Sequence, residues 1–337
     1  MSIPKPLRKD PRTRRRVALF VLFIGLAILS ILYGLMVGAI SIPAKEVWTS
    51  LFSSTDSEFR QIVWNLRLPR VFTGLLIGIC LAISGAFLQG VFRNPLADPG
   101  IIGVSSGAGL AAVSIMILFP EHMSLVPLAA FLGALLAAAI IYALAWNKGA
   151  PTGRMILAGV AVNSLLGAGM TTVMLLNSEK VQSVLPWLAG SLNGKSWPHF
   201  DTIAPYACIG ILLSFFLIKH ANVLILGDEV AKLLGNRVER SRMLVILMST
   251  FMAGVAISVA GLIGFVGLVV PHIVRMIVGN DYKYFLPLSA IGGGALVVAA
   301  DTSARAWFDP IEFPVGVLLA LLGAPFFLYL LKRGLKV

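Results

Sequence analysis

Ten apolar segments recur along this chain of 337 residues and restrict what it can fold into. Most are close to the about 20 residues that a helix needs to cross the roughly 30 Å hydrocarbon core of a bilayer. Because 58% of the residues are hydrophobic and only 12% are charged, too little charge is present to cover a soluble globule. A backbone in lipid must satisfy its own hydrogen bonds, so these segments predict an all-α polytopic membrane protein with about ten transmembrane helices. They are Val17–Ile40, Val71–Phe92, Ile102–Phe119, Leu125–Trp146, Met155–Leu176, Thr202–Ile218, Met243–Leu262, Phe265–Val278, Phe285–Ala300 and Pro314–Leu331.

The eighth segment is shorter than the others and glycine-rich at its start. Gly261, Gly264 and Gly267 precede or open it, and a stretch this short does not cross the hydrocarbon core as a straight helix. We therefore expect a broken or re-entrant element here.

Basic residues are distributed unevenly between the loops. The net charge is +12, and a basic cluster within residues 1–16 precedes an apolar run that is too long for a cleaved signal peptide. If the N-terminus is cytoplasmic and alternate loops are assigned from there, 20 of the 27 Lys and Arg residues fall inside, as the positive-inside rule requires. The sequence thus predicts a basic cytoplasmic tail (1–16), a single transmembrane domain (17–337) and both termini in the cytoplasm. The outer basic residues are Lys45, Arg60, Arg67, Arg70, Lys180, Lys195 and Arg305.

Motifs for chemistry within the chain are weak. The stretch Gly190–Ser196 is similar to a phosphate-binding loop but has three residues between its glycines instead of four, and it lies in a predicted external loop. The four histidines are scattered, and Cys80 and Cys208 lie inside apolar segments, so no metal site, disulfide or directly bound cofactor is expected. We therefore predict that the chain is not an enzyme and that any ATP is bound by another subunit.

A short amphipathic helix is predicted in the cytoplasmic segment 226–236, between the sixth and seventh spans. Acidic residues suit its start, glycine suits its stop, and its apolar face is too short to cross a membrane. The alternative is that this helix lies in the lipid headgroup layer. The residues assigned to coupling with another protein are Gly227, Asp228, Glu229, Val230, Leu233, Leu234 and Gly235.

Several motifs together resemble the FecCD family, the iron-chelate and vitamin B12 uptake permeases of ABC importers. The resemblance covers nearly the whole chain. The motifs are Arg67-Leu-Pro-Arg70, Gly85-Ala-Phe-Leu-Gln89, Arg93-Asn-Pro-Leu-Ala-Asp-Pro-Gly100, Gly103-Val-Ser-Ser-Gly-Ala-Gly109, Leu226-Gly-Asp-Glu-Val-Ala231, Gly264-Phe-Val-Gly-Leu-Val-Val-Pro-His-Ile-Val-Arg275, Pro314-Val-Gly-Val and Leu322-Gly-Ala-Pro-Phe326.

This resemblance implies an assembly and its contact sites. Two permease copies, or this chain and a paralogue, would surround a central pathway in the bacterial cytoplasmic membrane, and two ATPase subunits would bind the coupling helix. An extracytoplasmic binding protein, expected to be a siderophore-binding lipoprotein, would dock through its carboxylates on Arg67, Arg70 and Arg305. The residues assigned to helix packing or the pathway are Gly85, Gln89, Asn94, Pro95, Gly103, Gly107, Pro271 and His272.

The substrate class is indicated by a single stretch of the sequence. The external stretch Leu185–Trp197 is more similar to siderophore permeases than to cobalamin permeases, so ferric siderophore ranks first, haem second and cobalamin third. A secondary transporter coupled to ions is the alternative from another class. No carboxylate lies in the middle of a predicted span, which disfavours it, although some carriers hold ions with backbone carbonyls instead.

Overall fold

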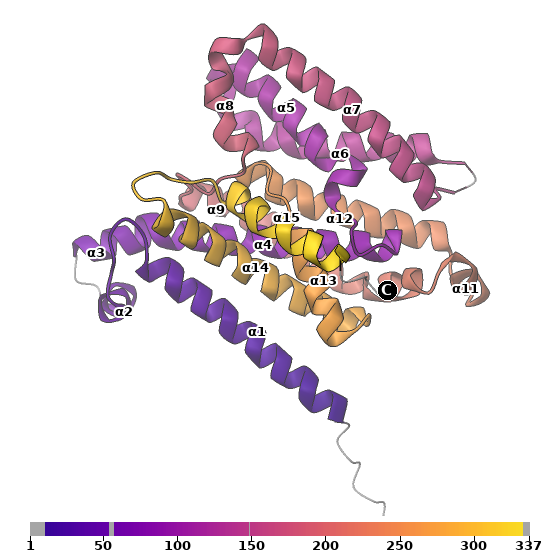
Figure 1. The fold of residues 1–337 in the computed structure, drawn as a ribbon, viewed down its shortest axis with the longest axis horizontal. Coiled ribbons are helices and arrows are strands. Elements are labelled where there is room, and N and C mark those ends of the chain that lie inside the picture. The colour runs from indigo at the N-terminus through magenta and orange to yellow at the C-terminus, as the bar shows by residue number, and fades with distance from the viewer. Residues whose placement is uncertain (1–10, 54–56, 148, 333–337) are drawn as a thin grey trace, which may run out of the picture.

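The computed structural model describes residues 11–53, 57–147 and 149–332, and its elements are helices joined by short turns (Figure 1). The first half contains α1 (Pro11–Met36), α2 (Ala44–Phe52), α3 (Glu58–Gln61), the π-helical turn η1 (Ile62–Arg67), α4 (Leu68–Phe92), η2 (Pro99–Ile102), α5 (Val104–Leu118), η3 (Pro120–Leu125), α6 (Val126–Ala145) and α7 (Thr152–Leu176). The second half contains η4 (Ser178–Lys180), α8 (Val181–Leu188), α9 (Trp197–Phe216), α10 (Ile218–Ile225), α11 (Asp228–Leu233), α12 (Val238–Ala260), α13 (Val266–Val278), α14 (Tyr282–Trp307) and α15 (Val315–Lys332).

The helices match the predicted spans closely. Seven helical stretches of the described chain are long and apolar enough to cross a bilayer, and three shorter apolar helices, α5, α13 and most of α15, account for the remaining segments. The prediction of an all-α polytopic protein is therefore confirmed.

The centre of the molecule is α4, which packs against α14, α12, α13 and α9. Its contact with α14 depends on small residues, because a Cβ added at Gly78 would lie 2.2 Å from the carbonyl oxygen of Gly293. In lipid, such close backbone approach supplies the van der Waals contact that holds helices together. By contrast, α1 and α7 are largely uncovered by the rest of the chain. Helices α5, α6 and α7 form a second group beside this centre (Figure 1).

The predicted break precedes the eighth span. The chain leaves the helical conformation after Ala260 and resumes it at Val266, and α13 has only 13 residues, about 20 Å at 1.5 Å per residue. The irregular backbone is satisfied by the end of α8: Leu262 donates to the Trp187 carbonyl at 3.2 Å, and Ser191 donates to the Ala260 carbonyl at 2.9 Å. Non-helical backbone at membrane depth is tolerated only when neighbouring protein groups pair with it in this way.

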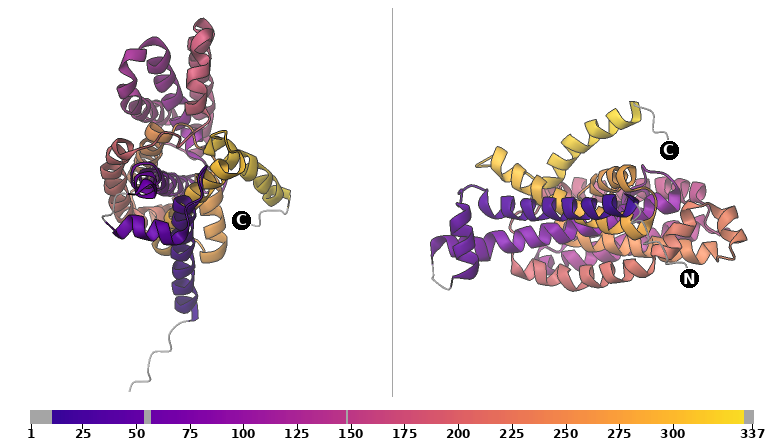
Figure 2. Two further views of the ribbon diagram at one scale, coloured as in Figure 1. Left: turned by 90° about the vertical axis from the view of Figure 1, so that its left-hand side faces the viewer. Right: turned by 90° about the horizontal axis from the view of Figure 1, so that it is seen from below.

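One end of the long axis gathers the start of α1, the coupling helix α11 and the end of α15, while α2 and α3 lie at the other end (Figures 1 and 2). Arg15 donates to the carbonyl of Ile277 at 3.1 Å, and the guanidinium of Arg16 lies 4.0 Å from the centre of the Tyr284 ring. These contacts tie the start of α1 to the turn between α13 and α14. Most of the predicted tail, 1–16, lies outside the described residues. The end that holds the start of α1 and helix α11 is called the inner end, and the end that holds α2 and α3 is called the outer end.

Two helices extend further outward than the hydropathy pattern indicated. Residues 58–92 form one continuous helical stretch, and α14 continues to Trp307. The arginines predicted to precede the second span and to follow the ninth therefore lie within helices. Helix α14 can continue past its apolar segment because Asp301 and Arg305 are one turn apart and offset each other's charge. The Arg305 Nε lies 3.3 Å from an Asp301 oxygen.

Candidate functional site

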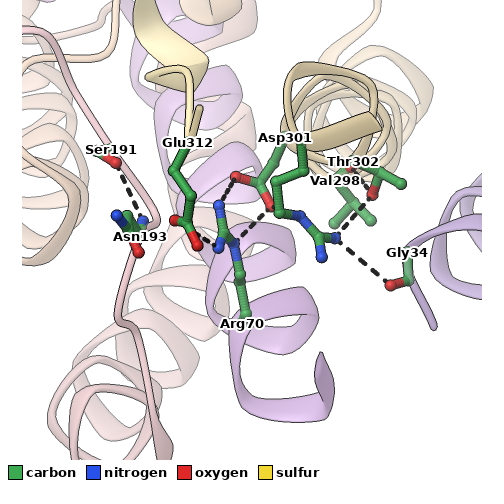
Figure 3. Close-up of polar contacts among 9 residues, drawn as sticks. Gly34, Arg70, Ser191, Asn193, Val298, Asp301, Thr302 and Glu312 are labelled. Atoms are coloured by element: carbon green, nitrogen blue, oxygen red, sulfur yellow. Dashed lines mark hydrogen bonds and ion pairs between the residues drawn. The ribbon is translucent and has the colours of Figure 1, made fainter. Parts of the chain in front are cut away.

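An ion-pair network lies at the outer end of α4 and α14 (Figure 3). Arg70 forms two parallel bonds with the carboxylate of Asp301, from Nε and from Nη2, each 2.9 Å long. Its Nη1 also lies 3.3 Å from an oxygen of Glu312, in the turn between α14 and α15. Arg70 and Asp301 are 8% and 3% exposed. A paired and buried arginine of this kind holds helices in a fixed arrangement rather than reaching into solvent.

Arg67 fastens the end of α1 to the same region. Its Nη1 donates to the carbonyl of Leu35 at 2.6 Å, and its Nη2 donates to the carbonyl of Ile40. Arg305 lies beside Gly34 of α1 and Thr302 of its own helix. The three arginines predicted to dock a partner thus come together from two helices, around the point where α1 ends.

These side chains line an open pocket with a volume of about 460 Å³ at the outer face. The loop between α8 and α9 supplies another wall, and it brings the half-buried Lys195, for whose ammonium group the described residues show no anionic partner. Burial lowers the pKa of Lys195. The charged residues that line the pocket are Arg67, Arg70, Lys195, Arg305, Asp309 and Glu312.

The exposure of the docking arginines differs from the expectation. The sequence suggested arginines that offer free guanidinium groups to a partner, but Arg67 and Arg70 are buried and the carboxylates nearest to Arg70 and Arg305 belong to this chain. The physical reason is that a charge on a membrane helix is costly unless it has a partner, so carboxylates of this chain pair with Arg70 and Arg305, and backbone carbonyls accept from Arg67. A docking role for the three arginines remains a prediction.

At the inner end, the coupling segment folds as the sequence indicated. Its helix α11 begins at Asp228, after Gly227 in a positive-φ conformation (+93°). It ends at Leu233 and is followed by Gly235 at φ +76°, where the N–H of Gly235 donates to the Lys232 carbonyl and the N–H of Asn236 donates to the Ala231 carbonyl. This pair of bonds is the Schellman arrangement, which requires a residue without a Cβ penalty at the left-handed position.

The apolar side chains of this segment are uncovered. Val230, Leu233 and Leu234, which we call the α11 face, are 45%, 88% and 60% exposed. Adjacent exposed apolar side chains of this kind suit contact with another protein or with the lipid headgroup layer. Glu229 is exposed as well.

The segment is nevertheless firmly attached to the rest of the chain. Asn222 of α10 donates to Asp281 at 3.2 Å and accepts from the backbone N–H of Tyr282 at 2.9 Å. A ring nitrogen of His220 lies 2.9 Å from the hydroxyl of Ser241 on α12. Asp228 forms an ion pair of 2.6 Å with Arg242, also on α12. The segment thus combines an exposed apolar face with fixed contacts to α12 and to the start of α14.

Among the eight residues assigned to packing or the pathway, four lie at helix contacts. A Cβ at Gly85 would lie 1.9 Å from the carbonyl oxygen of Gly267 in α13, and the buried Gln89 donates to the carbonyls of Gly267 and Leu268. Gly103 and Gly107 face α6, and a Cβ at Gly107 would lie 2.2 Å from the Gly133 carbonyl oxygen. These positions are built for close helix packing.

The other four are divided between a turn and α13. Asn94 accepts from the backbone N–H of Leu96 at 2.9 Å and so shapes the turn after α4, in which Pro95 also lies. Pro271 lies inside α13. His272 is 7% exposed, and neither of its ring nitrogens has a hydrogen-bond partner among the described residues. None of the eight lines the outer pocket.

Sequence reasoning missed two residues of these regions. The sequence marks Lys195 as an outer basic residue, but no local pattern around it indicates that it lines a pocket. Arg242 was counted only as an inner basic residue. Its position inside the first turns of an apolar helix was a usable signal, because a charge placed there needs a partner.

Comparison with known proteins supplies a family. The FecCD transport family matches residues 26–333. A cobalamin import permease of Halobacterium salinarum is 47% identical over 80% of this chain and 73% of its own length. An Fe(3+)-citrate import permease of Bacillus subtilis is 38% identical over 97% of this chain and 98% of its own length. A hemin transport permease of Yersinia pestis is 39% identical over 96% and 97%.

Solved structures agree with this result. A metal-chelate type ABC transporter in an inward-facing conformation superposes with a TM-score of 0.84 at 29% identity, covering 94% of this chain and 99% of that one. The PsaBC proteins of Streptococcus pneumoniae give a TM-score of 0.59 at 18% identity over 86% of this chain and 99% of that one, a likeness of fold alone.

Proposed function

The chain belongs to the FecCD transport family and is a permease of an ABC importer, and we propose that its cargo is a ferric siderophore. In this proposal an extracytoplasmic binding protein delivers the complex, and separate ATPase subunits bind and hydrolyse ATP. The chain binds no cofactor of its own and forms the pathway with a second copy or a paralogue, in the cytoplasmic membrane of a bacterium.

The observation that carries the proposal is that contact features lie at both ends of the molecule. The outer pocket contains Lys195, Arg67 and Arg305, an excess of positive charge suited to carboxylates of a docking protein. The inner end carries the exposed α11 face on an anchored arm. A secondary transporter that works alone would have no use for the second feature.

A further apolar surface supports the second permease. A groove of about 360 Å³ lies between α13, α14 and α15, and its lining is almost entirely apolar, including Phe265, Leu319 and Phe326. Figure 2 shows α15 projecting away from the body of the molecule. Packing of a second subunit here would place the broken element before α13 next to the shared pathway.

Iron chelates are supported by relatives that cover almost the full chain and are named for Fe(3+)-citrate, iron-hydroxamate or siderophore transport. The second candidate is cobalamin, favoured by the 47% identity of the Halobacterium salinarum permease.

The test is uptake into proteoliposomes that contain this chain, its ATPase and its binding protein. Radioactive iron supplied as ferric hydroxamate or ferric citrate, hemin, and radioactive cyanocobalamin are compared with and without internal ATP. We expect ATP-dependent accumulation of an iron chelate. Accumulation of cyanocobalamin alone would show that cobalamin, and not a ferric siderophore, is the cargo. Uptake that needs an ion gradient but no ATPase would refute the ABC mechanism.

A further inference from the structure

Arg242 is the most buried charged side chain of the described chain, 2% exposed, and it lies where three segments of the inner end meet. These are the helix α11, the start of α12 and residues 149–151, which precede α7. The established family and the proposed partners do not explain why a guanidinium group occupies this point.

The bonds of Arg242 join all three segments. Its Nη2 donates to Asp228, the first residue of α11, at 2.6 Å. Its Nη1 donates to Glu239, one turn earlier on α12, at 2.6 Å, and to the carbonyl of Ala150 at 3.2 Å. A guanidinium group can serve three acceptors at once because its donors are fixed in a planar fork, whereas an ammonium group cannot reproduce that geometry.

Two side chains of α12 bind the backbone of Ala150, between α6 and α7, one at its N–H and one at its carbonyl. Glu239 accepts from the backbone N–H of Ala150 at 3.0 Å, while Arg242 donates to the carbonyl of the same residue. A Cβ at Gly149 would lie 2.8 Å from an oxygen of Glu239, and Gly149 has φ +140°, so the turn fits closely over this carboxylate. The turn therefore follows any movement of the first turns of α12.

These contacts define a mechanical link between the surface that a partner covers and helices that it does not touch. The α11 face is exposed, but Asp228 behind it is bonded to Arg242. Through Ala150, two residues before α7 begins, Arg242 reaches α7 and, by the packing of α7 on α6, the group of helices beside the centre (Figure 1). Buried, close-packed contacts transmit displacement because they have little room to compress.

We propose that Arg242 is a positioning residue for coupling, which transmits displacement of α11 through Glu239 and Ala150 to the helices α6 and α7. This inference rests on the proposed function, because it takes an ATPase to be the partner that moves α11. Arg242 itself touches neither ATP nor cargo.

The test uses the complete complex, reconstituted with its ATPase and binding protein, and measures cargo transported per ATP hydrolysed. Arg242→Lys keeps the charge between the two carboxylates but loses the fork. Asp228→Asn removes the ionic part of the link to α11, and it leaves no buried charge unpaired because Arg242 keeps its ion pair with Glu239. The matched control is Arg240→Lys, an exposed arginine two residues away with no ion pair among the described residues.

We expect both variants to lower the ratio of transport to hydrolysis by about tenfold, within the range that coupling between two sites usually spans. In Arg242→Lys, hydrolysis and the melting temperature of the purified complex should stay near those of the unmutated complex. The double variant should lose no more than either single variant, because both residues lie on one path from α11 to Ala150.

Two outcomes overturn the inference. An unchanged ratio in Arg242→Lys and Asp228→Asn shows that the link carries no coupling. A joint fall of transport, hydrolysis and melting temperature, with additive losses in the double variant, shows a purely structural role. If the unmutated complex transports nothing in response to ATP, the proposed function fails instead, so the two failures are distinct.

Discussion

Replacement of Arg70 by methionine should strongly destabilise the outer end of the molecule. The change removes one partner of a buried pair and leaves Asp301, 3% exposed, with only Arg305 at 3.3 Å. At the charge separation of a bidentate pair, the Coulomb attraction is about 4 kcal/mol at an effective dielectric near 20. Breaking a buried pair in this way costs about 3–5 kcal/mol, so we expect the free energy of unfolding to fall by that amount.

The measurement is reversible unfolding of the purified chain in mixed detergent micelles with increasing dodecyl sulfate, followed by tryptophan fluorescence and circular dichroism. Asp301→Asn completes a double-mutant cycle, and the interaction energy should be about 2 kcal/mol in favour of the pair. The matched control is Lys45→Met, an exposed basic residue at the same end, which should change stability by less than about 0.5 kcal/mol. Additive effects of the Arg70 and Asp301 substitutions, or a loss no larger than that of Lys45→Met, would refute the reasoning.

Three further predictions concern topology, coupling and docking. In a cysteine-free background, a cysteine at Ser178 should react with an impermeant thiol reagent applied to intact cells and one at Asn236 should not; labelling at Asn236 would overturn the assigned sides. Replacing all three residues of the α11 face by serine should abolish stimulated ATP hydrolysis while membrane insertion stays normal. Unchanged uptake in this variant would show that the segment lies in the lipid headgroup layer instead. Lys195→Glu should slow association with the binding protein, most strongly at low salt, whereas Lys45→Glu serves as its control. Because burial lowers the pKa of Lys195, its ammonium group loses its proton at a lower pH than that of an ordinary lysine. As the pH rises, the contribution of Lys195 to docking should therefore disappear while exposed lysines are still charged.

The fold could be predicted because lipid imposes a simple rule on sequence. Each span must be apolar and internally hydrogen bonded, so the segment count, and even the break near Gly261, follow from hydropathy and glycine placement. The ends of helices could not be predicted in the same way. Hydropathy stops at the first charge, whereas α14 continues past Asp301 because Arg305 and Arg70 neutralise that carboxylate.

The site residues divide along a similar line. The coupling helix is a local feature, and its start after Gly227 and its stop at Gly235 are determined by backbone conformations that only a few residue types accept. The bonds of Arg70 and Arg242 join residues far apart in sequence, such as Arg70 with Asp301 and Arg242 with Ala150. Neither hydropathy nor spacing encodes such pairs, so the structure was needed to find them.

Helix α4 runs between the two ends of the molecule and makes a contact at each of them, which bears on how a signal crosses the membrane. At its outer end Arg70 joins the ion-pair network, and just after its inner end Arg93 lies so close to the coupling segment that a Cβ at Gly227 would be 2.9 Å from its Nη1. Between them, α4 is largely buried and touches α14 backbone to backbone at Gly78. No side chain separates the two helices at that point, and the Arg70–Asp301 pair joins them again at the outer end, so α4 and α14 are tied together at two points along their length. Displacement of α4 on the α11 side would therefore be passed to α14 and the outer network, while the proposed role of Arg242 concerns α6 and α7 on the other side of α12.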